Sequence, residues 1–260
     1  MKKSKAKASS ALHISDSNLS HAWGRVLLHA TDPTMRDITP LIVTIEGLDA
    51  TGMPREDKEI RNALDAFLKK HDEWSVDVVA FTIFPQSYLE IAKGDRKKLY
   101  EIYNDAFEHL RAANRANSHG LYFERLIAFG RGSLNENQLE NIIKEYNAGS
   151  RRRSLFQAVV YDPGRDQTRQ PYLPFPCLQG ISFVPSPEGL VMNAIYPMQY
   201  LITRGYGNFL GLTQLGAFMA AQMKLKFLQL NVVAGVETVD FSKKDLESLI
   251  DVVRSKIEKE

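Results

Sequence analysis

This 260-residue chain contains a single cysteine, Cys177. One thiol excludes an internal disulfide and is typical of a reducing, intracellular compartment. No stretch approaches the roughly 18 to 20 apolar residues that a membrane helix requires. The net charge of +2 is too small to indicate a nucleic-acid partner. These absences predict a cytoplasmic protein that binds neither membranes nor nucleic acid.

The sequence also lacks the motifs of several common chemistries. The six histidines show no i, i+4 pair around a glutamate and have no cysteine partners, so no metal site is expected. There is no Walker loop, and "GRGS" at 130–133 is too short to cradle a phosphate. No G-x-S-x-G elbow is present. The glycine-rich "RGYGN" at 204–208 predicts a turn.

The chain reads as one domain behind a basic tail. The opening "MKKSKAKASS" lacks the apolar region of a signal peptide, and residues 1–12 are predicted to be a disordered basic tail. We find no internal repeat and no linker long enough to divide the remainder. Residues 13–260 are therefore predicted to form a single domain.

Helical and strand patterns alternate along this domain. Apolar periodicity and capping residues predict helices over 16–30, 53–74 (starting near Pro54), 95–114, 135–149, 210–225 and 242–260. Runs rich in β-branched residues predict strands over 38–47, 76–84, 154–161 and 227–239, and a strand pair within 181–196. Such a mixture indicates an α+β fold with helices around a large sheet.

The cysteine lies in an unusually stiff segment, "RQPYLPFPCLQGISF" at 169–183. Pro174 and Pro176 restrict the backbone and exclude it from a regular ladder, which places the thiol at the entrance to a strand. One interpretation of Cys177 is a small buried hydrophobe. The other is a reactive nucleophile, and the sequence around the thiol leaves both open.

Three consecutive arginines, Arg151 to Arg153 in "SRRRS", precede this segment. A cationic cluster favours the thiolate form of a nearby cysteine, and guanidinium groups match phosphate in bidentate geometry. The alternative is a solvated turn. A nucleophilic cysteine with a phosphate-binding arginine pair is thus a coherent hypothesis.

The order of several segments resembles thymidylate synthase, especially a shorter, divergent archaeal form. The resemblance runs from about residue 121 to Asp240 and is carried by "NQLENIIKEYNAGS", "RRRSLFQAVVYDP", "PCLQGISF", "EGLVMNAIY" and "GNFLGLTQLGAFMAAQM". It implies a large mixed β-sheet flanked by helices, and a homodimer packed through that sheet. Residues 50–115 have no match in the family.

The resemblance also implies a chemistry. Cys177 matches the cysteine that attacks C6 of a pyrimidine nucleotide, after which C5 accepts a one-carbon unit from 5,10-methylenetetrahydrofolate. Arg151 and Arg152 match the pair that reaches the nucleotide phosphate of the partner subunit. Asn208 matches the asparagine that hydrogen-bonds the pyrimidine edge, and Arg36 corresponds to a flexible-loop arginine. No metal is implied.

Several positions depart from the family. The residues at positions that in the family bind phosphate, folate, base or ribose are Met198, Gln199, Leu201, Thr238 and Asp240, and Ser182 stands where the family has a glutamine or an acid. Losing one charge-assisted contact costs about 1.5–3 kcal/mol, so losing several together changes the activity itself. Two hypotheses follow: a methyl- or hydroxymethyltransferase for a nucleotide other than standard dUMP, or a catalytically degenerate homologue that binds nucleotides or serves as a structural partner.

Overall fold

The computed structural model describes residues 11–31, 37–114, 117, 119–130, 137–169 and 175–258. Arg36, the predicted loop arginine, and Pro174 lie outside these residues, as do residues 1–10 of the predicted tail. Leu12, the last residue assigned to that tail, begins the first strand.

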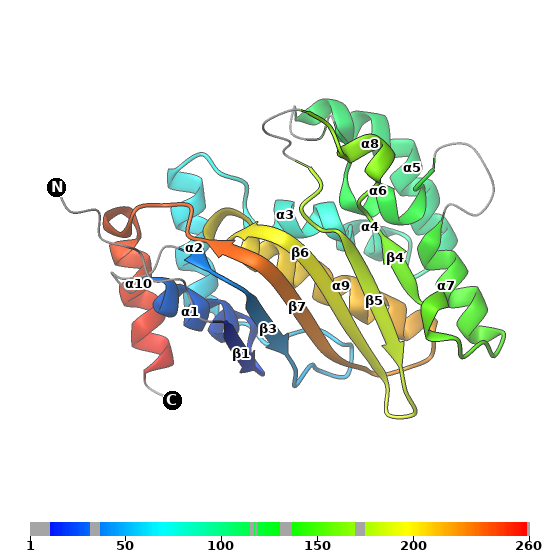
Figure 1. The fold of residues 1–260 in the computed structure, drawn as a ribbon, viewed down its shortest axis with the longest axis horizontal. Coiled ribbons are helices and arrows are strands. Elements are labelled where there is room, and N and C mark those ends of the chain that lie inside the picture. Colours follow the sequence, from blue (N-terminus) through cyan, green and yellow to red (C-terminus); the bar gives the residue numbers. More distant parts are fainter. Residues whose placement is uncertain are drawn as a thin grey trace.

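A seven-stranded mixed sheet forms the centre of the described chain (Figure 1). Its strands are β1 (Leu12–Asp16), β2 (Asp37–Ile38), β3 (Leu41–Ile45), β4 (Gln157–Val159), β5 (Gly180–Pro185), β6 (Leu190–Tyr200) and β7 (Phe227–Thr238). Their order is β1-β3-β7-β6-β5-β4, and β2 pairs with β7. The β1–β3 and β6–β7 pairs are parallel and the others antiparallel.

Helices fill the connections between the strands. They are α1 (Leu19–Ala30), α2 (Lys58–Lys70), α3 (Val76–Ile83), α4 (Gln86–Ile91), α5 (Arg96–Ala113), α6 (Tyr122–Ile127), α7 (Gln138–Asn147), α8 (Pro163–Asp166), α9 (Tyr206–Gln222) and α10 (Lys243–Ile257). A π-helical turn, Leu201–Gly205, joins β6 directly to α9. The expected large mixed sheet with flanking helices is confirmed.

The helix α9 packs behind the sheet, while the near face of β5, β6 and β7 carries no described helix (Figure 1). Burial along β6 agrees with this arrangement. Met192, Ala194 and Tyr196 are at most 1% exposed, whereas Ile195 between them is 53% exposed. The alternation means that one face of the sheet is buried in the core and the other is open.

The strand predicted over 76–84 is wrong, because this segment forms the helix α3. Ser75 caps the helix, and Val76, Val79, Ala80 and Ile83 face the core at helical spacing. The valines of this segment favour a strand, but packing against the rest of the fold overrides this local preference.

Two glycines of α9 explain why α3 can pack closely against that helix. A Cβ on Gly207 would lie 2.5 Å from the Cβ of Val79, and one on Gly211 would lie 2.6 Å from the carbonyl oxygen of Ala80. The absence of these side chains lets the two helices approach closely. α3 is thereby held against the helix that begins beside the candidate site.

Two other sequence predictions need correction. The helix expected from Pro54 begins at Lys58, because the Asp57 side chain accepts hydrogen bonds from the amides of Glu59 and Ile60. The turn expected over 204–208 is helical, since the π-turn continues into α9 without a break.

Candidate functional site

Cys177 lies just before β5 and is half-buried. Its backbone amide donates a 3.3 Å hydrogen bond to the hydroxyl of Tyr122, the first residue of α6. The Tyr122 ring stacks on Phe175, with centroids 5.0 Å apart. The thiol is therefore held at the junction of a strand, a helix and an aromatic pair.

A buried ion pair supports this segment from behind. Arg125, 1% exposed, donates two hydrogen bonds to the Asp166 carboxylate, the shorter 2.8 Å long. Its guanidinium also lies over the Phe175 ring, 5.1 Å from the centroid. Because both charges are paired and hydrogen-bonded, the ring two residues before the thiol has a fixed support.

Opposing effects act on the thiol. Burial raises the pKa of Cys177 above its ordinary value, while the positive charge of Arg204 lowers it. Burial is the larger effect, so the thiol is protonated at neutral pH. Burial also raises the pKa of Tyr122. Arg204 is thus the charged group that favours the reactive thiolate.

Arg204 belongs to the π-turn and is positioned from two sides. Its guanidinium lies over the ring of Trp74, 5.0 Å from the centroid, and within 4.0 Å of the Glu73 carboxylate. The turn itself is held by Asp240, whose carboxylate accepts hydrogen bonds from the amides of Ile202 and Thr203. Asp240 therefore has a structural role in this chain.

Three buried polar side chains lie nearby. Tyr196, Gln199 and Glu237 are 1%, 2% and 1% exposed, and within the described chain their hydroxyl, amide and carboxyl groups have no hydrogen-bond partner. Burial, then the charges of Tyr122 and Cys177 when these ionise, raises the pKa of Tyr196. The Tyr196 hydroxyl therefore lies within electrostatic range of the thiol.

Gln199 and Glu237 are register partners on β6 and β7. Burial, followed by the charge of Asp240, raises the pKa of Glu237 well above its ordinary value. This environment favours the neutral form of the carboxyl group, since an unpaired buried carboxylate is very costly.

The predicted site residues are only partly brought together. Asn208 is 4% exposed in the first turn of α9, next to the π-turn that carries Arg204. Arg151 and Arg152 are exposed after α7; Arg151 donates to the carbonyls of Tyr146 and Ser150. Neither arginine bonds to Cys177 or Tyr122 in the described single chain. Their predicted role across a dimer stays a prediction.

Positions that depart from the family pattern have other roles. Leu201 is fully buried and Gln199 nearly so, while Met198 is partly exposed. Thr238 donates a hydrogen bond to the Asp37 side chain. The two positions that match the family's phosphate clamp therefore carry a partly exposed methionine, Met198, and a buried glutamine, Gln199, and neither side chain has a positive charge.

Sequence reasoning missed Tyr122, Arg204 and Glu237. Arg204 stood in a stretch interpreted as a turn. Glu237 carried a usable signal, because it is an acid within an otherwise apolar strand, "FLQLNVVAGVETV". Tyr122 had no local signal; only the fold brings it to Cys177, which is 55 positions away.

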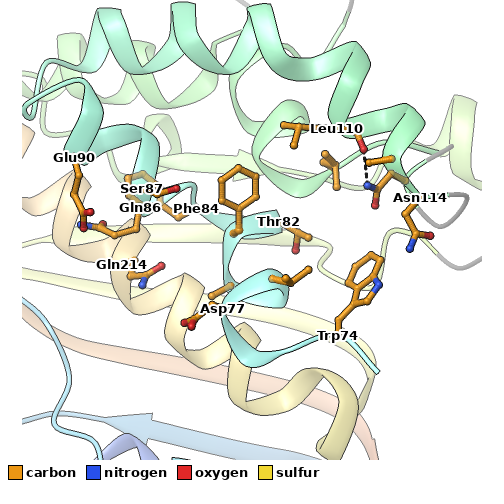
Figure 2. A pocket seen from close by; sticks show the side chains of 16 residues that line it. Trp74, Asp77, Thr82, Phe84, Gln86, Ser87, Glu90, Leu110, Asn114 and Gln214 are labelled. Atoms are coloured by element: carbon orange, nitrogen blue, oxygen red, sulfur yellow. Dashed lines mark hydrogen bonds between the residues drawn. The ribbon is translucent and has the colours of Figure 1, made fainter. Parts of the chain in front are cut away.

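A cavity of about 570 Å³ opens beside this site (Figure 2). It is bounded by α3, α4 and the C-terminal half of α5. Its described lining consists of Trp74, Asp77, Val78, Ala80, Phe81, Thr82, Phe84, Gln86, Ser87, Glu90, Leu110, Ala113, Asn114, Asn117, Leu121 and Gln214. Trp74 connects the two regions, because Arg204 covers its ring.

No group of histidine, cysteine and acidic residues among the described positions has the geometry to hold a metal ion. None of the helices in the described ranges is long and apolar enough to cross a membrane. No protein-family model matches the chain, and no curated protein matches it.

Proposed function

We propose that this chain is a thymidylate synthase-like transferase that adds a one-carbon unit to C5 of a pyrimidine nucleotide through a covalent adduct at Cys177. The observation that carries the proposal is the surroundings of the thiol. A half-buried cysteine lies within electrostatic range of a cation, Arg204, and of a buried hydroxyl, Tyr196, that has no described partner. Unsatisfied polar groups of this kind are typical of sites that receive a polar ligand.

The chemistry follows from these groups. The Cys177 thiol loses its proton and the sulfur adds to C6, which moves the C5–C6 electron pair to C5. C5 would then form a bond to the one-carbon unit and lose its proton to solvent, and the C–N bond that joins this unit to its carrier would break. Addition of water for a hydroxymethyl product, or of a hydride supplied by the reduced carrier for a methyl product, would complete the unit, and elimination of the thiolate from C6 would restore the ring double bond. Arg204 stabilises the thiolate at the start and end of this sequence. Tyr122 positions the sulfur through the Cys177 amide.

We assign residues to substrate recognition from the resemblance and from their positions in the fold. Asn208, buried in the first turn of α9, is the candidate reader of the pyrimidine edge. Arg151 and Arg152 are free of acidic partners among the described residues, and they are candidates for the phosphate of a partner subunit's nucleotide. The buried Gln199 and Leu201 argue against standard dUMP as the substrate.

The resemblance implies 5,10-methylenetetrahydrofolate as donor of the one-carbon unit. The partly exposed aromatic side chains of Trp74 and Phe81 in the neighbouring cavity suit its flat rings. Its acidic tail fits less well, because the charged side chains in the described lining are Asp77 and Glu90. The identity of the donor thus rests on the resemblance and on the match between its flat rings and the aromatic side chains of the cavity.

The deciding experiment is intact-protein mass spectrometry after incubation with 5-fluoro-dUMP or 5-fluoro-dCMP, with and without methylenetetrahydrofolate. We expect a mass increase of one nucleotide, or of nucleotide plus donor, that is absent in Cys177→Ser. Because the chain has one cysteine, any thiol adduct is located by its mass alone. No adduct with either nucleotide would overturn the proposal.

A second candidate is a catalytically degenerate homologue that only binds nucleotides. It is favoured by the net rise in the pKa of Cys177, which disfavours the thiolate. A thermal-shift panel of dUMP, UMP, dCMP and CMP separates the two, since a bound ligand raises the melting temperature by mass action. Stabilisation by a nucleotide without any adduct supports this second candidate.

A further inference from the structure

The backbone of the π-turn that carries Arg204 is held at two points before that residue. The Trp23 indole N–H donates a 2.9 Å hydrogen bond to the carbonyl oxygen of Leu201, the first residue of the turn. The Asp240 carboxylate accepts hydrogen bonds from the amide and from the hydroxyl of Thr203. Because the backbone is fixed in this way, the place of the positive charge depends on the contacts of the Arg204 side chain itself.

That side chain has two partners in the segment before α3. The guanidinium carbon of Arg204 lies 5.0 Å from the centroid of the Trp74 ring. The Nη1 atom lies 4.0 Å from a carboxylate oxygen of Glu73 and donates a 2.8 Å hydrogen bond to the Thr203 carbonyl. The Arg204 and Glu73 side chains are 35% and 34% exposed. The ion pair is therefore long and partly solvated, so the guanidinium can also stabilise another anion.

The thiol lies within range of the same cation. Burial raises the pKa of both Cys177 and Tyr122, and the positive charge of Arg204 lowers both. The two groups are neighbours, because the Tyr122 hydroxyl accepts a hydrogen bond from the Cys177 amide. Burial also raises the pKa of Tyr196, the other titratable neighbour of the thiol, well above its ordinary value. Of these groups, Arg204 carries a charge at neutral pH.

We propose that Trp74 and Glu73 are positioning residues with opposite effects on the reactivity of Cys177. The Trp74 ring holds the Arg204 guanidinium, by attraction to the negative face of the indole, where its charge favours the thiolate. The Glu73 carboxylate partly neutralises that charge and so restrains the thiol. The inference rests on the proposed function, because it takes Cys177 as the nucleophile, and it assigns the residues that set how readily this nucleophile ionises.

The rate at which iodoacetamide alkylates Cys177 tests both assignments, since the thiolate sulfur displaces iodide in this reaction. Glu73→Gln should shift the pH profile of the rate to lower pH and raise the rate at about pH 7.5 by about two- to fivefold, the range expected for one partly exposed charge pair. Trp74→Leu should shift the profile to higher pH and lower the rate by a similar factor. Trp74→Phe keeps an aromatic face and should stay within about twofold of wild type.

A double variant shows whether Glu73 acts through the guanidinium. In an Arg204→Gln background, Glu73→Gln should change the alkylation rate by less than about 1.5-fold. Asp72→Asn is the matched control, because Asp72 is the exposed acid next to Glu73 and asparagine tolerates its positive φ of 58°. The profile of this control should coincide with that of wild type.

Each assignment has an outcome that would overturn it. A slower reaction of Glu73→Gln, or an equal acceleration with and without Arg204, contradicts the role of Glu73. A Trp74→Leu variant that melts as wild type and reacts as fast contradicts the role of Trp74. Alkylation requires no nucleotide, so these outcomes are independent of the 5-fluoropyrimidine adduct. Opposite shifts without an adduct would retain the two roles and overturn the proposed chemistry, and an adduct without the shifts would do the reverse.

Discussion

The backbone amide of Cys177 donates a hydrogen bond to the hydroxyl of Tyr122, 3.3 Å away. This contact joins the segment that carries the only thiol to the start of α6, and the Tyr122 ring also packs on Phe175. The hydroxyl therefore sets the position of the sulfur without contacting it. Tyr122→Phe retains the ring and removes only this acceptor.

We expect Tyr122→Phe to form the 5-fluoropyrimidine adduct about three- to tenfold more slowly, which corresponds to the roughly 0.5–1.5 kcal/mol of one hydrogen bond. The rate of adduct formation is measured by intact mass against time. Tyr161→Phe, at a half-buried tyrosine of the same fold, is the matched control. Identical rates in wild type and Tyr122→Phe would show that the amide contact does not position the thiol.

Arg204 should control how readily the thiol ionises. Its charge lowers the pKa of Cys177 against the larger, opposing effect of burial. Arg204→Gln removes the favourable charge, so the pKa should rise further and the alkylation rate at neutral pH should fall. The measurement is the pH profile of iodoacetamide alkylation, which should shift to higher pH.

The control for that shift is Arg254→Gln, a half-exposed arginine of α10 whose partners are Asp251 and Glu258. Its alkylation profile should coincide with that of the wild type. A profile for Arg204→Gln that moves to lower pH, or does not move, contradicts the assigned role of this arginine.

These residues show where sequence reasoning succeeds and where it stops. β6 and β7 follow from runs rich in β-branched residues, and α10 from its cap at Ser242 and amphipathic spacing. Such signals depend only on neighbouring residues, so they can be identified from the sequence without knowledge of the fold. The position of Cys177 before a strand was predictable for the same reason, because prolines act on their own neighbours.

The partners of Cys177 were not predictable in this way. Tyr122 and Arg204 lie 55 and 27 positions from it along the chain, and only the packing of α6 and the π-turn brings them close. α3 was mistaken for a strand because its fit depends on Gly207 and Gly211 in a distant helix. Long-range complementarity of this kind has no local signature.

Glu237 should make the stability of the protein fall as the pH rises. Its pKa is raised above the ordinary 4.5 in the folded state, so the folded protein binds a proton that the unfolded chain has lost. The contribution of the neutral Glu237 to the free energy of unfolding is fully present below its unfolded-state pKa of about 4.5. It falls by about 1.4 kcal/mol per pH unit between the unfolded-state pKa and the folded-state pKa, and is lost once the pH has passed the folded-state pKa.

Glu237→Gln keeps the shape and removes the titration. Urea unfolding at about pH 5 and about pH 9 should show a smaller loss of unfolding free energy in this variant than in wild type. Glu247→Gln, at an exposed acid of α10, should behave as the wild type. Parallel losses in wild type and Glu237→Gln would mean that Glu237 is not held neutral.

The open face of the sheet is the surface through which the predicted homodimer would pack. Across it runs a row of register partners, Ile42, Val233, Ile195, Gly180 and Val159. Ile195 and Val159 are 53% and 46% exposed, which places large apolar side chains in water in the single chain. A second copy that covers this row would bury them, and the resemblance implies that Arg151 and Arg152 of one subunit then reach the nucleotide phosphate of the other.

We therefore expect a dimer by light scattering coupled to size-exclusion chromatography, and a monomer for Ile195→Glu, because a buried unpaired charge is too costly at the centre of an apolar interface. Ile91→Glu is the matched control, since Ile91 is 60% exposed on α4, away from the sheet. If the proposed phosphate role of the arginines is correct, Ile195→Glu also loses nucleotide binding, whereas Ile91→Glu retains it. A wild-type monomer that still forms the Cys177 adduct would separate the chemistry from the dimer, and would require each chain to bind phosphate through its own residues.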